Sequence, residues 1–166
     1  MGDIIQSAWG IVYYLDSSGE PRYLLIKRHA LSGKIERVSP KGKVQPGEAV
    51  ETTALREVSE ETWIPIAQLR LKQMIWTTQL RNLENIKGQM DKDVTYFLME
   101  FVGNPNIVAI DQKEWYVWIH KWANMQEVLG LIYYQDIREL IRKSYLIVKQ
   151  DQKNASVKKQ FIERLT

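Results

Sequence analysis

The most informative absence in this sequence is cysteine, which does not occur among the 166 residues. Disulfide bonds, thiolate metal sites and cysteine nucleophiles are therefore all excluded. A chain without thiols suits a reducing compartment, and we expect a cytoplasmic protein. Any metal site must use oxygen or nitrogen ligands, and the chain has only two histidines to offer nitrogen.

Long hydrophobic runs are also missing. The first ten residues, MGDIIQSAWG, lack a basic segment followed by an apolar stretch, so we predict no signal peptide. The longest apolar runs are too short to span a bilayer, and we expect no membrane partner. A net charge of +3 is compatible with an anionic small molecule but is too weak to indicate nucleic acid.

The length predicts one compact domain, which we place at residues 1–148, followed by a basic tail or surface helix at 149–166. Residues rich in β-branched and aromatic types predict five strands, at 8–15, 22–27, 69–80, 94–102 and 115–119. The turn residues of 16–19 join the first two strands in a hairpin.

Helices are expected at 49–62, 124–131 and 134–148, and loops at 33–47 and 82–92. This order of elements predicts an α/β (α+β) domain with a mixed sheet.

Three glutamates crowd the end of the first predicted helix. At about 100° per residue, Glu57, Glu60 and Glu61 fall within one arc of roughly 100° on its surface. Such clusters are usually solvated faces. Here the Glu57–Glu61 spacing is repulsive, and the helix dipole disfavours anions in the last turn. A hard divalent cation with oxygen ligands, such as Mg²⁺, is the natural partner.

The same stretch resembles the signature of the Nudix hydrolase family, the Nudix box. The matching positions are Gly42, Glu48, Arg56, Glu57, Val58, Glu60, Glu61 and Ile64. The preceding Pro40-Lys41-Gly42 and the segment Val94–Leu98 resemble the diadenosine polyphosphate hydrolases of that family. The resemblance implies a mixed sheet sandwiched between helices. It also implies Mg²⁺- or Mn²⁺-dependent hydrolysis of phosphoanhydride bonds in substrates linked to a nucleoside diphosphate.

The resemblance also implies roles for individual residues. Glu57, Glu60 and Glu61 would bind the metal, together with a backbone carbonyl near Lys41 and Gly42. Arg56 would pair with Glu48 and orient the helix and the loop. The general base would be either Glu57 or Glu114, and a surface charge is an equally good interpretation of Glu114.

Substrate contacts are predicted on the same grounds. Lys41 would contact phosphate as a point charge, and the neighbouring Lys43 would either contact phosphate or be solvated. Tyr96 or Phe97 would hold a base, although ordinary sheet packing explains both rings as well.

Dinucleoside polyphosphates such as diadenosine tetraphosphate are therefore the leading substrates. RNA 5′ ends and diphosphoinositol polyphosphates are the alternatives within the enzyme class. A Nudix-fold regulatory module without catalysis is the non-enzymatic alternative, and the three retained glutamates argue against it.

Two positions depart from the family pattern. Arg37-Val38-Ser39 stands where those relatives have an aromatic or large apolar residue, and Trp63 replaces the second glycine of the box. Glycine there supplies a left-handed conformation after the helix. Because Pro65 favours an extended Ile64, we expect Trp63 to adopt an ordinary conformation with its ring packed on the sheet. A left-handed Trp63 whose buried ring offsets the strain is the alternative.

Overall fold

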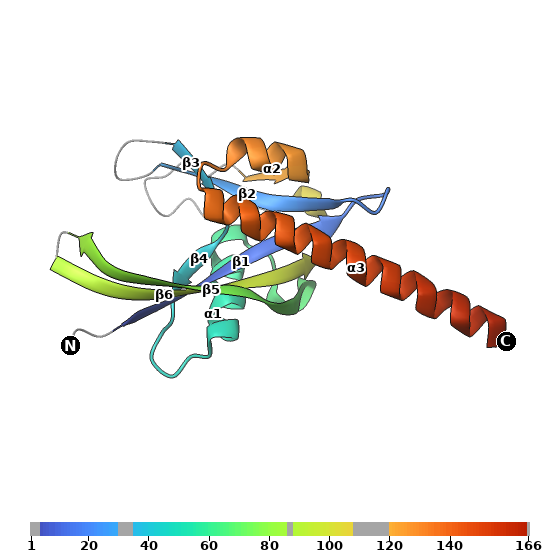
Figure 1. Cartoon of the computed structure of the whole chain (residues 1–166), viewed down its shortest axis with the longest axis horizontal. Helices are drawn as coiled ribbons and strands as arrows, with labels where there is room; N and C mark the ends of the chain where they lie inside the picture. The colour runs from blue at the N-terminus through green and yellow to red at the C-terminus, as the bar shows by residue number, and fades with distance from the viewer. Residues whose placement is uncertain (1–3, 30–34, 86–87, 108–119, 166) are drawn as a thin grey trace.

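The computed structural model describes residues 4–29, 35–85, 88–107 and 120–165. These residues form a mixed sheet flanked by helices (Figure 1). The strands are β1 (Ile5–Leu15), β2 (Pro21–His29), β3 (Ile35–Val38), β4 (Lys41–Lys43), β5 (Leu69–Asn85), β6 (Gly88–Phe101) and β7 (His120–Ala123). The α-helices are α1 (Val50–Thr62), α2 (Met125–Leu131) and α3 (Gln135–Leu165), and short 3₁₀ turns lie at Ile66–Gln68 and Pro105–Ile107.

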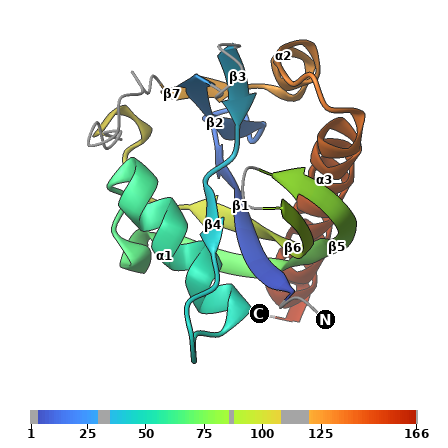
Figure 2. The same ribbon diagram turned by 90° about the vertical axis from the view of Figure 1, so that its left-hand side faces the viewer.

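The described part of the sheet has the order β3-β2-β1-β6-β5, with β4 pairing to β1 and β7 to β2. Strands β1 and β6 run parallel, and the other pairs are antiparallel. Helices α1 and α3 lie on opposite faces (Figure 2). Buried residues accordingly form one cluster beneath α1 and another beneath α2 and α3. The predicted fold class, a mixed sheet between helices, is confirmed.

The predicted first hairpin, first helix and α2 are confirmed, with boundaries shifted by only a few residues. The loop predicted at 33–47 is wrong in part, because β3 and β4 lie within it. Both strands are too short for a visible alternation of apolar and polar residues. The strand predicted at 115–119 lies outside the described residues.

The loop predicted at 82–92 is wrong. Strand β5 extends to Asn85 and β6 begins at Gly88, and the paired strands project from the body as an arm (Figure 1). Its polar residues pair with one another, as in the contact between Arg81 Nη1 and Asp93 Oδ1 at 2.7 Å. An arm with few buried side chains needs no alternation of apolar and polar residues, so its strands look like a loop in sequence.

Helix α3 is 31 residues long and does not end near Val148 as predicted. Val148 is the last residue of the helix that is buried, and the segment beyond it has no glycine or proline to stop the helix. The apolar periodicity of the sequence is lost where α3 stops packing against the body, and the helix itself continues beyond that point. Since α3 crosses residue 148 without a break, the division into a domain and a tail stays a prediction.

Candidate active site

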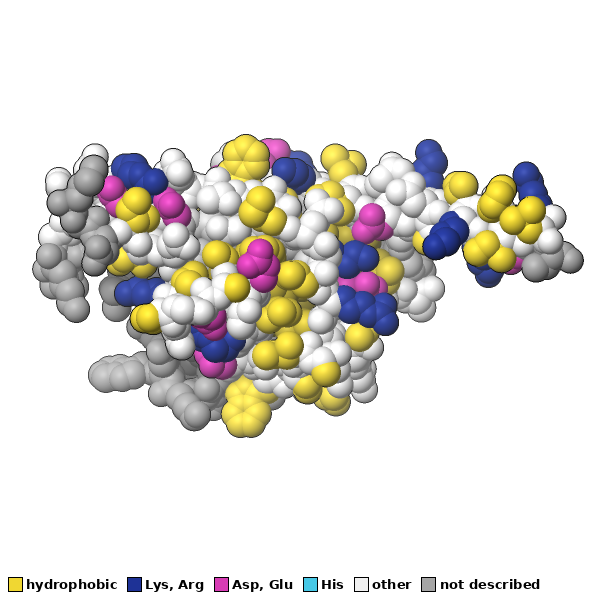
Figure 3. All heavy atoms as spheres, turned by 90° about the horizontal axis from the view of Figure 1, so that it is seen from below, with side chains coloured by type: hydrophobic (Ala, Val, Ile, Leu, Met, Phe, Trp, Pro, Cys, Tyr) yellow, Lys and Arg dark blue, Asp and Glu magenta, His cyan; other side chains and the backbone are white. Residues whose placement is uncertain are grey.

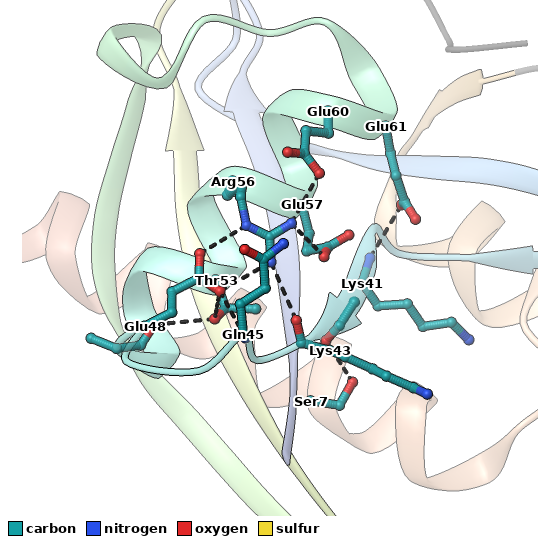
Figure 4. Close-up of polar contacts among 12 residues, drawn as sticks. Ser7, Lys41, Lys43, Gln45, Glu48, Thr53, Arg56, Glu57, Glu60 and Glu61 are labelled. Carbon is teal, nitrogen blue, oxygen red and sulfur yellow. Dashed lines mark hydrogen bonds and ion pairs between the residues drawn. The ribbon is translucent and has the colours of Figure 1, made fainter. Parts of the chain in front are cut away.

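Helix α1 carries the predicted site on the side that faces β4, next to the side that packs on the rest of the sheet. Thr53, Ala54, Val58 and Thr62 are buried against the strands. Gly10 in β1 lets α1 approach the sheet closely, since a Cβ on this residue would lie 2.3 Å from Val58 Cγ2. The glutamates consequently project along the outer side of the helix, next to β4 (Figure 4).

Arg56 connects three of the carboxylates. Its Nε donates to Glu48 Oε1 at 2.8 Å, and its Nη1 donates to Glu57 Oε1 at 2.7 Å and to Glu60 Oε2 at 2.9 Å (Figure 4). These contacts raise the pKa of the guanidinium further above its usual value, Glu48 contributing most. One permanent positive charge thus offsets the repulsion that the sequence predicts within the cluster.

Glu48 fixes the loop before the helix. Its Oε2 accepts hydrogen bonds from Arg56 Nη2, from the Thr53 hydroxyl at 2.7 Å and from the Gln45 N–H at 3.1 Å. The bond to Arg56 is the largest of the effects that lower the pKa of Glu48, to about 2. The predicted pair of Glu48 and Arg56 is therefore present, and it joins loop 44–49 to the middle of α1.

Strand β4 lies directly against the carboxylates. A Cβ on Gly42 would fall 1.8 Å from Glu57 Cδ, so only glycine allows this approach. The Gly42 carbonyl accepts a hydrogen bond from Ser7 Oγ at 2.8 Å, and the Lys41 N–H donates to Glu61 Oε2 at 3.2 Å. Gly42, Glu57 and Glu61 are thus brought together as the sequence predicts.

The predicted substrate residues lie beside this cluster, and the structure adds Trp9. The Lys41 ammonium sits 4.3 Å from the centroid of the Trp9 ring, whose centroid lies 5.3 Å from that of Tyr96. Lys41, Trp9 and Tyr96 are consecutive partners across β4, β1 and β6. Sequence analysis missed Trp9 because only the sheet register places it next to Lys41; it otherwise looks like any aromatic residue of a buried strand.

Other predicted residues are less directly placed. Tyr96 is only 4% exposed and belongs to the core, where burial raises its pKa to about 12. Its hydroxyl therefore stays neutral, and its contact with a base stays a prediction. Lys43 contributes its backbone carbonyl, which accepts from Arg56 Nη2 at 3.2 Å, while its side chain is exposed. Glu114 lies outside the described residues.

Trp63 differs from the expectation. It has φ 58° and ψ 16°, in the left-handed region, and its N–H caps the helix by donating to Ser59 O at 2.8 Å. The side chain is 63% exposed, so the favoured interpretation is wrong in both conformation and packing. The alternative interpretation is right about the left-handed backbone of Trp63 but wrong in placing its ring in a buried environment. Pro65 restrains only the residue before it, and Ile64, at 2% exposure, is the residue that packs.

The donor chemistry of this cluster fits a hard divalent cation. It offers three carboxylates close to the backbone of Lys41 and Gly42, and carboxylate and carbonyl oxygens are the ligands that such an ion prefers. Within the described ranges, however, no three acidic or histidine side chains converge on one point. Arg56 Nη1 stands between Glu57 and Glu60 and donates to one oxygen of each. Each of these carboxylates has a second oxygen that could serve as a ligand.

The fold and this cluster agree with a comparison against protein families, in which residues 5–143 match the NUDIX domain. The chain belongs to the Nudix family, and it is an enzyme of the pyrophosphohydrolase class. No helix in the described part of the chain combines the length and apolar character needed to cross a membrane.

Two of the proteins similar in sequence to this chain have the same name. The chain is 29% identical over 142 residues to the asymmetrical bis(5′-nucleosyl)-tetraphosphatase of Caenorhabditis elegans, covering 84% of this chain and 94% of that protein. The mouse enzyme of the same name is 28% identical over 64% of this chain and 67% of its own length.

Solved structures with the same fold include the C. elegans Ap4A hydrolase binary complex. Its TM-score is 0.70 at 24% identity, covering 89% of this chain and 99% of that one. The E. coli dihydroneopterin triphosphate pyrophosphohydrolase has a TM-score of 0.65 at 19% identity, over 83% of this chain and 92% of its own.

Proposed function

We propose that this enzyme hydrolyses dinucleoside polyphosphates, such as diadenosine tetraphosphate, with Mg²⁺ or Mn²⁺ bound at the α1–β4 cluster. The observation that carries the proposal is the packing of Glu57 and Glu61 against β4 at Gly42 and Lys41, with Arg56 and Glu48 supporting the helix. The names of the C. elegans and mouse relatives support the choice of substrate.

The proposed ligands are Glu57, Glu60, Glu61 and the Gly42 carbonyl. A bound divalent cation supplies charge neutralisation at the phosphoryl oxygens and lowers the pKa of a water molecule. Water attacks a phosphorus atom, its oxygen forms the new P–O bond, and the bridging oxygen leaves with the other nucleotide. Either Glu57 or Glu114 takes the proton from the water.

Arg56 is a positioning residue. It is 19% exposed and bonded to three carboxylates, so it sets the spacing of Glu57 and Glu60 and has no donor directed at a substrate in this arrangement. Lys41 binds a phosphate of the substrate. Its ammonium rests over the Trp9 ring, which keeps the positive charge next to β4 and the carboxylate cluster.

The test is hydrolysis of a substrate panel by the wild type and by Glu60→Gln. The panel contains diadenosine tetraphosphate, ADP-ribose, 5′-triphosphate RNA and a diphosphoinositol polyphosphate. We expect cleavage of diadenosine tetraphosphate into unequal nucleotides, dependent on Mg²⁺, and its loss by roughly a hundredfold or more in Glu60→Gln because a ligand charge is removed.

The matched control is Glu51→Gln, which removes an exposed glutamate from the first turn of the same helix and should leave turnover unchanged. Preferred cleavage of the RNA or the inositol compound would reject the substrate and keep the site. Unchanged turnover in Glu60→Gln at saturating Mg²⁺ would reject Glu60 as a principal ligand.

A further inference from the structure

The last three turns of α3 project beyond the body of the protein (Figure 1). The body holds the helix as far as Gln152, whose side chain donates to the Gly19 carbonyl at 2.7 Å. Every residue from Lys153 to Leu165 is exposed. This segment, called here the projecting helix, therefore owes little of its order to packing against the described body.

The projecting helix is amphipathic. Val157, Phe161, Ile162 and Leu165 are 58%, 62%, 50% and 72% exposed. At about 100° per residue they occupy an arc of roughly 140° around the helix. An exposed apolar face of this kind marks an interaction surface, because water is a poor environment for it.

The charges are arranged around that face. Lys153 and Arg164 border the arc on one side and Lys159 on the other, while Lys158 lies within it. The one acidic residue, Glu163, pairs with Lys159 at 3.9 Å and lies on the side away from the apolar arc. Figure 3 shows the same arrangement, with hydrophobic side chains gathered at the end of the helix and basic side chains on both sides.

We propose that the projecting helix binds the surface of an anionic lipid membrane, lying in the plane of the headgroups. Apolar side chains would enter the boundary between headgroups and acyl chains, and the bordering cations would contact lipid phosphates. Lys158 fits this partner well, because a lysine at an interface can bury its aliphatic stem while its ammonium reaches the headgroups. This mode of binding needs no spanning segment, and it differs from our expectation of no membrane partner.

A second copy of the chain fits less well. Pairing two projecting helices through four side chains each would bury roughly 800–900 Å² in total, below the 1,200 Å² or more of a stable interface. It would also place Lys158 inside the seam, away from water. A nucleic acid would use the cations but leave the four apolar side chains in water.

The test is sedimentation of the full chain with vesicles of phosphatidylcholine alone or with one-third phosphatidylglycerol. We expect binding to the anionic vesicles that exceeds binding to the neutral ones by roughly tenfold or more and that weakens as salt is raised. The double variant Val157→Ser, Phe161→Ser should lose this binding, and Lys158→Gln, Lys159→Gln should weaken it on anionic vesicles only.

Two controls separate this surface from the rest of the molecule. Met74→Ser alters a side chain that is 57% exposed on β5 and should bind vesicles like the wild type. Hydrolysis of a soluble substrate should be the same in all these variants, because none lies in the active site.

Three outcomes would overturn the proposal. These are equal binding of wild type and the serine double variant, a dimer in solution that Phe161→Ser dissociates, and RNA binding that depends on the lysines but not on Phe161.

Discussion

Trp63 provides a quantitative test of the reasoning about the end of α1. Replacing it with alanine removes a ring that is about one-third buried, which should cost about 1 kcal/mol if full burial stabilises by roughly 2–3 kcal/mol. Alanine still has a Cβ and keeps the left-handed strain at φ 58°. Glycine removes that strain, of roughly 1–2 kcal/mol, but loses about 0.4–1 kcal/mol through greater freedom of the unfolded chain.

Trp63→Gly should therefore be more stable than Trp63→Ala by up to about 1.6 kcal/mol and lie within about 1 kcal/mol of the wild type. Urea unfolding with an unchanged m-value measures the difference, and a change of 1 kcal/mol should shift Tm by roughly 2–4 °C. A loss of a few kcal/mol in Trp63→Gly would show that the ring is buried after all. A glycine variant less stable than the alanine variant would refute the left-handed conformation.

The remaining predictions concern the site. Gly42→Ala should fold, because the Glu57 carboxylate can move aside, but it should lose most of its hydrolytic activity. Urea unfolding and hydrolysis of diadenosine tetraphosphate measure the two effects. Gly130→Ala, whose Cβ would meet nothing within 4 Å, is the matched control in both assays. Lys41→Ala should raise KM more than it lowers kcat, since a charge on a phosphate that is not transferred binds substrate and transition state alike; a fall in kcat at constant KM would contradict this. Because the folded-state pKa of Glu48 is lowered to about 2, its contribution to stability is present above its ordinary pKa and lost as pH falls from about 5 towards 2. Acid unfolding of Glu48→Gln should lack that part of the pH dependence, and parallel curves for both proteins would count against the Arg56 pair.

Much of the site could be predicted because it is local. The carboxylates of α1 share one helix face, so their spacing in sequence fixes their arrangement in space. The pairing of Arg56 with Glu60 at i, i+4 and with Glu48 follows from the same short segment. The fold class could be predicted for a similar reason, because most of its strands and helices show a clear local pattern of apolar residues.

The features that could not be predicted depend on contacts between distant segments. Trp9 meets Lys41 and Tyr96 only through the pairing of β1 with β4 and β6. The β5–β6 arm and the end of α3 were missed because they bury few side chains, and periodicity records burial and not secondary structure itself. The conformation of Trp63 was predicted wrongly because Pro65 was taken to decide how the chain turns after α1. Pro65 restrains Ile64, whereas the cap of the helix is Trp63, one residue earlier.

The irregular pairing of β5 has a consequence for the behaviour of the protein in concentrated solution. β5 has 17 residues and β6 has 14, and the difference of three matches the three register shifts between them. β5 is also the outermost strand at its end of the described sheet, where unpaired backbone groups can recruit a strand from another molecule. Each extra residue bends and twists the strand, so a straight incoming strand can pair along only a short stretch before it loses register. The bulges thereby make the edge of β5 a poor template for a strand from another molecule.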